Sequence, residues 1–75
     1  MTREIARALV GGRILAKIWP RSSVSEFRVL ELSTNEQWIK LHDLTSRGGI
    51  AFWALLTDVS LIDQLIAVIP AGDQR

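Results

Sequence analysis

Hydrophobic and polar residues alternate with a period of two in the middle of the chain. Residues 27–32 (FRVLEL) and 37–43 (QWIKLHD) are two runs rich in β-branched, aromatic and leucine side chains. The polar residues 33–36 (STNE) between them have the composition of a turn. This pattern predicts a β-hairpin, and we expect the rest of the chain to be organised around it.

The alternation within this hairpin also predicts which side chains face the core. Phe27, Val29 and Trp38 fall on the other face, which is too apolar to be left in water and needs a cover, either from the sheet curling on itself or from a partner. The expected core face combines two residues from each strand: Leu30 and Leu32 with Ile39 and Leu41.

The segments before the hairpin predict a short helix and a strand. Thr2 is a suitable N-cap, and apolar residues recur at helical spacing until the glycine pair at 11–12, so we expect an amphipathic helix over residues 2–10 that docks by its Ile5 and Leu9 side. Residues 13–19 (RILAKIW) alternate and predict a strand that ends at Pro20, because proline lacks the N–H for the next ladder bond.

The segments after the hairpin predict a turn, a strand and a second helix. Residues 45–49 (TSRGG) suit a turn, and the apolar run 50–56 (IAFWALL) is expected to be the most buried strand. Ser60 and Asp63 resemble a capping box, followed by apolar residues at helical spacing until Pro70. This pattern predicts a helix over residues 61–69, although a partly stranded conformation of residues 58–69 stays open. The helix would have a wide apolar face, from which we infer a contact with a second subunit or another protein. The residues of that contact are Leu61, Ile62, Leu65, Ile66 and Ile69.

The predicted fold class is therefore α+β in a single domain over residues 1–75, with a short N-terminal helix, a four-stranded antiparallel meander and a C-terminal amphipathic helix. Residues 13–61 resemble the small SH3-like β-barrels in the order of their elements. The stretch 53–59 (WALLTDV) is similar to that family's pattern of an aromatic residue, a short turn and a buried valine. The resemblance implies an architecture and carries over no binding residue, and the chain has no tyrosine to match the family's ligand-binding ones.

Composition narrows the classes of function. The chain has no cysteine and one histidine, and its formal net charge is +1 from nine basic and eight acidic residues. Disulfides and thiolate metal sites are excluded, and a nearly neutral chain is not built to seek phosphate. The longest apolar run, residues 50–56, is short of the roughly 20 residues of a membrane helix, and charges interrupt the N-terminal apolar residues. We expect a soluble, cytoplasmic protein without a cofactor.

Few residues suggest chemistry. His42 has no second histidine or cysteine with which to form a metal or catalytic site, and we interpret it as a surface residue with Glu31 as its cross-strand neighbour. The serines at 22, 23 and 25 and the glycine pairs lack nucleophile and phosphate-loop motifs. The best cluster is aromatic and basic, and the alternative is that its tryptophans fill a second small core. Its members are Lys17, Trp38, Lys40 and His42.

Two functional hypotheses follow. The first is a non-enzymatic protein-interaction module that self-associates, as a dimer, or binds another protein through the C-terminal helix and the apolar sheet face. The second is a small nucleic-acid-binding barrel that uses the aromatic and basic cluster; an enzyme ranks third. The two are distinguished by whether Trp38 is buried against residues 61–69 of a neighbour or exposed beside Lys40.

Overall fold

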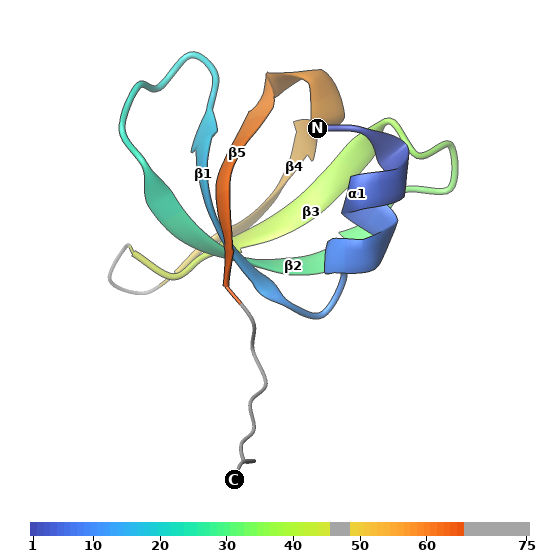
Figure 1. The fold of residues 1–75 in the computed structure, drawn as a ribbon, viewed down its shortest axis with the longest axis horizontal. Coiled ribbons are helices and arrows are strands. Elements are labelled where there is room, and N and C mark those ends of the chain that lie inside the picture. The colour runs from blue at the N-terminus through green and yellow to red at the C-terminus, as the bar shows by residue number, and fades with distance from the viewer. Residues whose placement is uncertain (46–48, 66–75) are drawn as a thin grey trace, which may run out of the picture.

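A five-stranded antiparallel sheet forms the body of the protein in a computed structural model that describes residues 1–45 and 49–65 (Figure 1). The strands lie in the order β4-β3-β2-β1-β5, and the sheet is strongly curved with the helix beside it. The elements in chain order are α1 (Arg3–Leu9), β1 (Arg13–Ile18), β2 (Ser25–Leu32), β3 (Trp38–Asp43), β4 (Ala51–Leu55), the 3-10 turn η1 (Leu56–Asp58) and β5 (Val59–Leu65).

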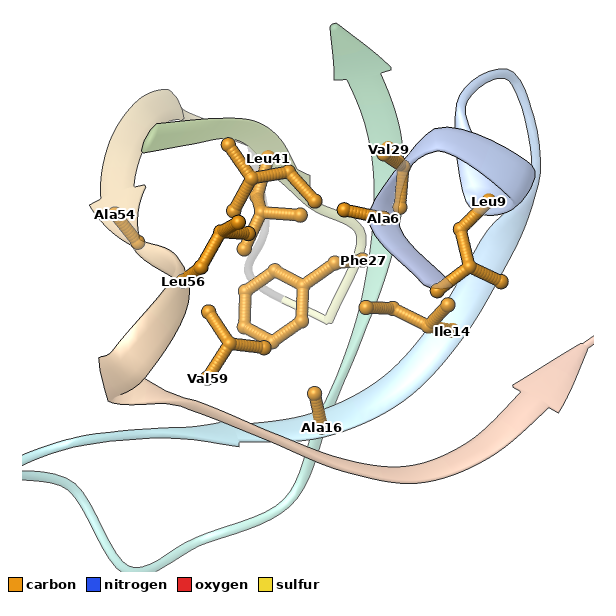
Figure 2. Close-up of a cluster of buried hydrophobic side chains, with 11 residues drawn as sticks. Ala6, Leu9, Ile14, Ala16, Phe27, Val29, Leu41, Ala54, Leu56 and Val59 are labelled. Atoms are coloured by element: carbon orange, nitrogen blue, oxygen red, sulfur yellow. The ribbon is translucent and has the colours of Figure 1, made fainter. Parts of the chain in front are cut away.

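The core fills the concave side of this curved sheet. Figure 2 shows the ring of Phe27 in the middle of the cluster, between Val59 and Leu56 on one side and the helix residues on the other. Side chains from α1, every strand and η1 converge there, so that one cluster closes the domain. The buried members are Ala6, Leu9, Ile14, Ala16, Phe27, Val29, Ile39, Leu41, Ala54, Leu56 and Val59.

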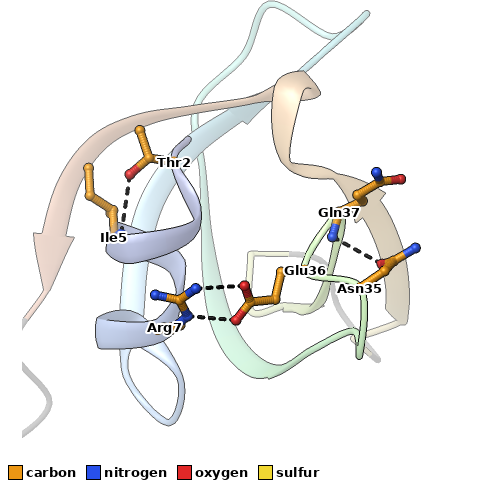
Figure 3. Close-up of polar contacts among 6 residues, drawn as sticks. All are labelled: Thr2, Ile5, Arg7, Asn35, Glu36 and Gln37. Atoms are coloured by element: carbon orange, nitrogen blue, oxygen red, sulfur yellow. Dashed lines mark hydrogen bonds and ion pairs between the residues drawn. The ribbon is translucent and has the colours of Figure 1, made fainter.

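The predicted N-terminal helix is confirmed, with one change in the face that it buries. The Thr2 hydroxyl accepts a hydrogen bond from the Ile5 N–H at 3.3 Å and so caps the first turn (Figure 3). The buried residues are Ala6 and Leu9, whereas Ile5 is exposed, so the docking side was misplaced by one position. The helix ends at Leu9, and the turn after it contains Gly11, whose φ of 90° favours glycine.

The central hairpin is confirmed, but a β-bulge corrects the assignment of its faces. Val29 pairs with Leu41 and Glu31 pairs with Lys40, so Leu30 is the extra residue on β2. Because one extra residue reverses the alternation, Val29 is buried before the bulge and Leu32 packs on the core after it. Leu30 was expected to face the core but is exposed. Phe27 and Val29 were expected on the second face but are buried in the core. Ile39 and Leu41 face the core as expected.

The strand over residues 50–56 is confirmed as β4, but it is not the most buried strand. β4 lies at one edge of the sheet, where β3 is its only partner among the described strands, and Ala51 and Trp53 are exposed. Aromatic and aliphatic content predicted burial on both faces, whereas the edge position leaves the outer face of β4 open.

The expected helix over residues 61–69 is wrong for its described part. Residues 59–65 form the fifth strand, β5, which pairs with β1 along its length. The register shifts so that Leu61 lies opposite Ala16 and Asp63 opposite Leu15, which leaves Ile62 as an extra residue. This bulge explains the two adjacent apolar residues that imitated helical spacing. Residues 66–69 lie outside the described residues.

Candidate interaction surface

The convex side of β3 and β4 carries an aromatic and basic surface. Trp38, Lys40 and His42 alternate with the buried residues of β3 and point outward, and Trp53 of β4 lies opposite Lys40. Trp38 is 40% exposed and Trp53 is 44% exposed. We name these four residues the outer aromatic face. Trp38 therefore stands exposed beside Lys40, and the second small core that the tryptophans were alternatively expected to fill is absent from the described parts of the chain.

Lys40 on β3 interacts with residues of both neighbouring strands, β4 and β2. Its Nζ lies 5.8 Å from the centre of the Trp53 ring and 4.0 Å from Oε2 of Glu31 on β2. A cation over an exposed indole contributes about 0.5–1 kcal/mol, and a surface ion pair at this distance contributes less. The ammonium therefore lies between an aromatic ring and a carboxylate on the surface of the sheet.

A shallow apolar hollow of about 380 Å³ lies between the two tryptophans, with Ser33 as its third wall. The Ser33 hydroxyl accepts a hydrogen bond from the Trp38 N–H at 3.0 Å and donates one to Asn35 Oδ1 at 2.7 Å. These bonds fix the start of β3, so the turn between β2 and β3 determines where the Trp38 ring stands. The hollow is lined by carbon surface and suits a flat or branched apolar group.

His42 is a partly buried member of the same face. It lies opposite Arg28 on β2 and Ala51 on β4, whereas Glu31, the neighbour expected from the sequence, lies opposite Lys40. The backbone of Gly49 approaches the imidazole so closely that a Cβ there would collide with Nε2. Over residues 1–45 and 49–65, no three histidine, aspartate or glutamate side chains gather as they would around a metal ion.

The other predicted site residues are not brought to this face. Lys17 lies on β1 opposite Ser60 of β5, and β2 separates β1 from β3. Of the predicted interaction set, Leu61 packs against the core and Ile62 is 51% exposed. Leu65 pairs with Arg13, and Ile66 and Ile69 lie outside the described residues.

Sequence reasoning missed Trp53 as a member of the surface. Its place opposite Lys40 depends on the register of β3 with β4, which the sequence alone does not reveal. The available signal was the period-two alternation of a strand, which places Trp53 on the face opposite the buried Ala54; the side-chain sizes in AFWAL do not themselves alternate. The uniform apolar character of the run concealed this alternation.

β4 presents an open backbone edge next to the two tryptophans. At the two ends of the β3–β4 ladder, the Asp43 N–H donates to the Ile50 carbonyl at 3.1 Å and the Leu56 N–H donates to the Gln37 carbonyl at 2.9 Å. Antiparallel bonds recur at every second residue, so Phe52 and Ala54 bond to β3. The N–H and C=O groups that point away from β3 are those of Ala51, Trp53 and Leu55.

The two edges of the sheet differ in their protection. Edge strands of monomeric proteins usually carry charged residues, proline or bulges that prevent further pairing. β5 has both Asp63 and the bulge at Ile62, whereas β4 (AFWAL) has no charge, no proline and no register shift against β3. The unprotected edge is therefore β4.

No protein-family model, curated protein or solved structure matches the chain. In the described residues, no helix has the length and apolar character needed to cross a membrane.

Proposed function

We propose that the chain is a non-enzymatic interaction module that self-associates as a dimer through the edge of β4 and the outer aromatic face beside it. The observation that carries this proposal is the unprotected edge of β4 next to Trp38 and Trp53, both about two-fifths exposed. Unpaired strand edges recruit a further strand, and exposed tryptophans supply the anchoring contacts of many interfaces.

The backbone pattern of β4 favours a second copy as the occupant. A dimer with two-fold symmetry pairs β4 with its own copy in antiparallel orientation, centred on one residue. Trp53 is the middle residue of β4, and its N–H and C=O point toward the open edge. In a register centred on Trp53, the two Trp53 residues exchange both backbone hydrogen bonds, and Ala51 bonds to Leu55 of the partner.

Side-chain sizes in this register complement each other. On the outer side, Trp53 meets its own copy and Ala51 meets the larger Leu55. On the inner side, Phe52 meets Ala54, again a large residue opposite a small one. Aromatic and large–small pairs across neighbouring strands stabilise a sheet by about 0.2–1 kcal/mol each.

Charge also supports self-association. The formal net charge of +1 gives two copies almost no mutual repulsion. This proposal keeps only Trp38 from the apolar sheet face of the sequence hypothesis, because Phe27 and Val29 lie in the core. It replaces the C-terminal helix with a strand edge, because residues 59–65 are β5. The order of strand, loop, hairpin, turn, strand and 3-10 turn supports the proposal of an SH3-like architecture.

A single introduced cysteine tests the register, since the natural chain has none. Directly opposed residues in a hydrogen-bonded antiparallel pair have Cα atoms about 5.5 Å apart, within disulfide range. Under mild oxidation, Trp53→Cys is expected to form a disulfide-linked dimer. The control is Ile62→Cys on β5, which is also exposed and is expected to stay monomeric in a denaturing gel. Cross-linking only in a mixture of the two variants would instead indicate head-to-tail pairing of β4 with β5.

A second experiment tests the interface without relying on a disulfide. Trp53→Asp places two carboxylates against each other in the centred register, so light scattering is expected to give the mass of one chain. Leu30→Asp is the matched control, because Leu30 is 38% exposed on β2, two strands away from the edge, and its mass should equal that of the natural chain. Circular dichroism confirms that both variants are folded. A natural chain that remains one copy at millimolar concentration contradicts the proposal.

A second candidate function is binding of single-stranded nucleic acid, favoured by the position of Lys40 over Trp53 with Arg28 and His42 on the same side of the sheet. Bases stack on exposed aromatic rings, and the cations attract phosphates. We rank it second because Glu31 already contacts Lys40 and the net charge is small. Oligonucleotide is expected to quench tryptophan fluorescence in a salt-dependent manner; an unchanged spectrum at low salt rejects this candidate.

A further inference from the structure

A pocket of about 350 Å³ opens at the end of the sheet where β1 and β3 finish and β2 and β4 begin. The pocket is separate from the outer aromatic face, because its lining comes from the concave side of the sheet and from the loop after β1. Its volume is at the lower end of the range of small-ligand sites.

The walls of the pocket are largely apolar, and three of the eight lining residues are aromatic. Phe27 is a buried core residue, and its ring meets that of Phe52 edge to face, with centroids 5.9 Å apart and planes at 77°. Trp19 and Ile50 stand on the rim and are each 71% exposed. These two exposed side chains add apolar surface beyond the cavity.

Two charged residues also line the pocket, and they differ in their surroundings. Asp43 continues the inward side of β3 after Leu41, is only 6% exposed, and accepts a hydrogen bond from the Thr45 N–H at 2.9 Å. Its carboxylate thus holds the chain after β3. Arg21 lies in the exposed loop after β1, where its N–H donates to the Ile18 carbonyl at 2.8 Å, and it forms no ion pair with any residue that the structure describes.

We infer that this pocket binds a small amphipathic carboxylic acid, with its aromatic or branched apolar body against Phe27, Phe52 and Trp19 and its carboxylate at Arg21. The apolar walls supply most of the contact area, as in most small-ligand sites. The guanidinium supplies a planar pair of donors that matches a carboxylate. The carboxylate of Asp43, which lines the same pocket, already accepts the Thr45 N–H, so the ligand's carboxylate is assigned to the exposed Arg21.

The test compares two probes that differ only in charge, 2-naphthylacetate and its neutral amide. The chain has three tryptophans, whose indole N–H signals can be followed separately by nuclear magnetic resonance. The Trp19 signal is expected to shift on titration with the acid, while those of Trp38 and Trp53 stay unchanged. The acid should bind about two- to fivefold more tightly than the amide, the range of an exposed ion pair.

Two exposed variants separate the contributions of charge and wall. Arg21→Gln is expected to reduce the affinity for the acid to that for the amide. Trp19→Ala is expected to lower the affinity for both probes; because this variant lacks the Trp19 signal, its binding is measured from the backbone signals of Ile50 and Phe52. The inference is overturned if acid and amide bind the natural chain equally, if Arg21→Gln has no effect on the acid, or if the shifts occur at Trp38 and Trp53. The monomeric variant Trp53→Asp should bind the acid like the natural chain, which separates this inference from the proposed dimer.

Discussion

Arg7 on α1 and Glu36 in the turn between β2 and β3 form a bidentate ion pair, with Nε to Oε2 and Nη2 to Oε1 both at 2.6 Å (Figure 3). The pair joins two segments that are 29 residues apart in the chain. Glu36 has a φ of 59°, a conformation that residues other than glycine seldom adopt, so the turn holds the carboxylate at a particular place beside the helix. The helix is thereby tied to the hairpin by charge as well as by its buried face.

This ion pair predicts a dependence of stability on pH. The hydrogen bond from Arg7 lowers the pKa of Glu36 below its ordinary value of 4.5 and raises that of Arg7, which stays charged throughout. A group with a lowered folded-state pKa stabilises the fold fully above its ordinary pKa and loses that contribution as pH falls through the lowered value. Glu36→Gln should therefore unfold at lower urea than the natural chain at pH 7, and the difference should disappear in acid.

Arg7→Gln is the matched control for this experiment. It removes the same pair from the other side, so the double variant should be no less stable at pH 7 than either single one. Added salt should reduce the difference, because the pair is exposed to solvent. A difference that persists below the pH at which Glu36 is protonated would mean that the backbone of the turn, rather than the charge, is responsible.

The bulge in β2 predicts unequal losses of stability for substitutions at two neighbouring residues. Val29→Ala removes buried methyl groups from the core and should cost roughly 2 kcal/mol of the free energy of unfolding. Leu30→Ala, although it removes more carbon, should cost less than about 0.5 kcal/mol, because Leu30 is exposed. Urea denaturation of the two variants measures both values. Equal losses would show that the two side chains are buried alike.

This pair of residues also indicates how far the sequence alone could lead. The positions of α1, β1, the hairpin and β4 follow from helical spacing, alternation and the turn residues, and they were predicted. The residues on each face of β2 could not be predicted, because Val29 and Leu30 are both apolar and only the register with β3 reveals the bulge. The same ambiguity applies to β5, where the adjacent apolar residues Leu61 and Ile62 fit helical spacing although they lie at a bulge in a strand.

The candidate surface was predicted in part for a related reason. Trp38, Lys40 and His42 share one face because they alternate on one strand, which sequence reveals directly. Trp53 lies on the same surface only because β4 pairs with β3 in this register. Lys17 lies away from this surface because β2 separates β1 from β3. Strand order and register depend on contacts between segments distant in sequence, which local patterns do not report.

The close approach of Gly49 to His42 predicts a strong effect of a single methyl group. Gly49→Ala brings a Cβ against Nε2 of His42 and within 3.1 Å of the Asp43 carbonyl oxygen, at a φ of 39° that alanine seldom adopts. We expect a loss of about 1–3 kcal/mol. Gly11→Ala, at a φ of 90° with open space around the added atom, provides the control for backbone strain alone and should cost less. Thermal unfolding of both variants tests the order; a larger loss at Gly11 would contradict it.

The open edge of β4 predicts which amide protons depend on protein concentration. The N–H groups of Phe52 and Ala54 bond to β3 and should exchange slowly in dilute and concentrated solutions alike. Those of Ala51, Trp53 and Leu55 point to the open edge and should exchange quickly when dilute and slowly when concentrated, because a second β4 then accepts their hydrogen bonds. In Trp53→Asp, the edge amides should exchange quickly at every concentration. If all five amides respond alike, or none does, the two copies do not pair along β4.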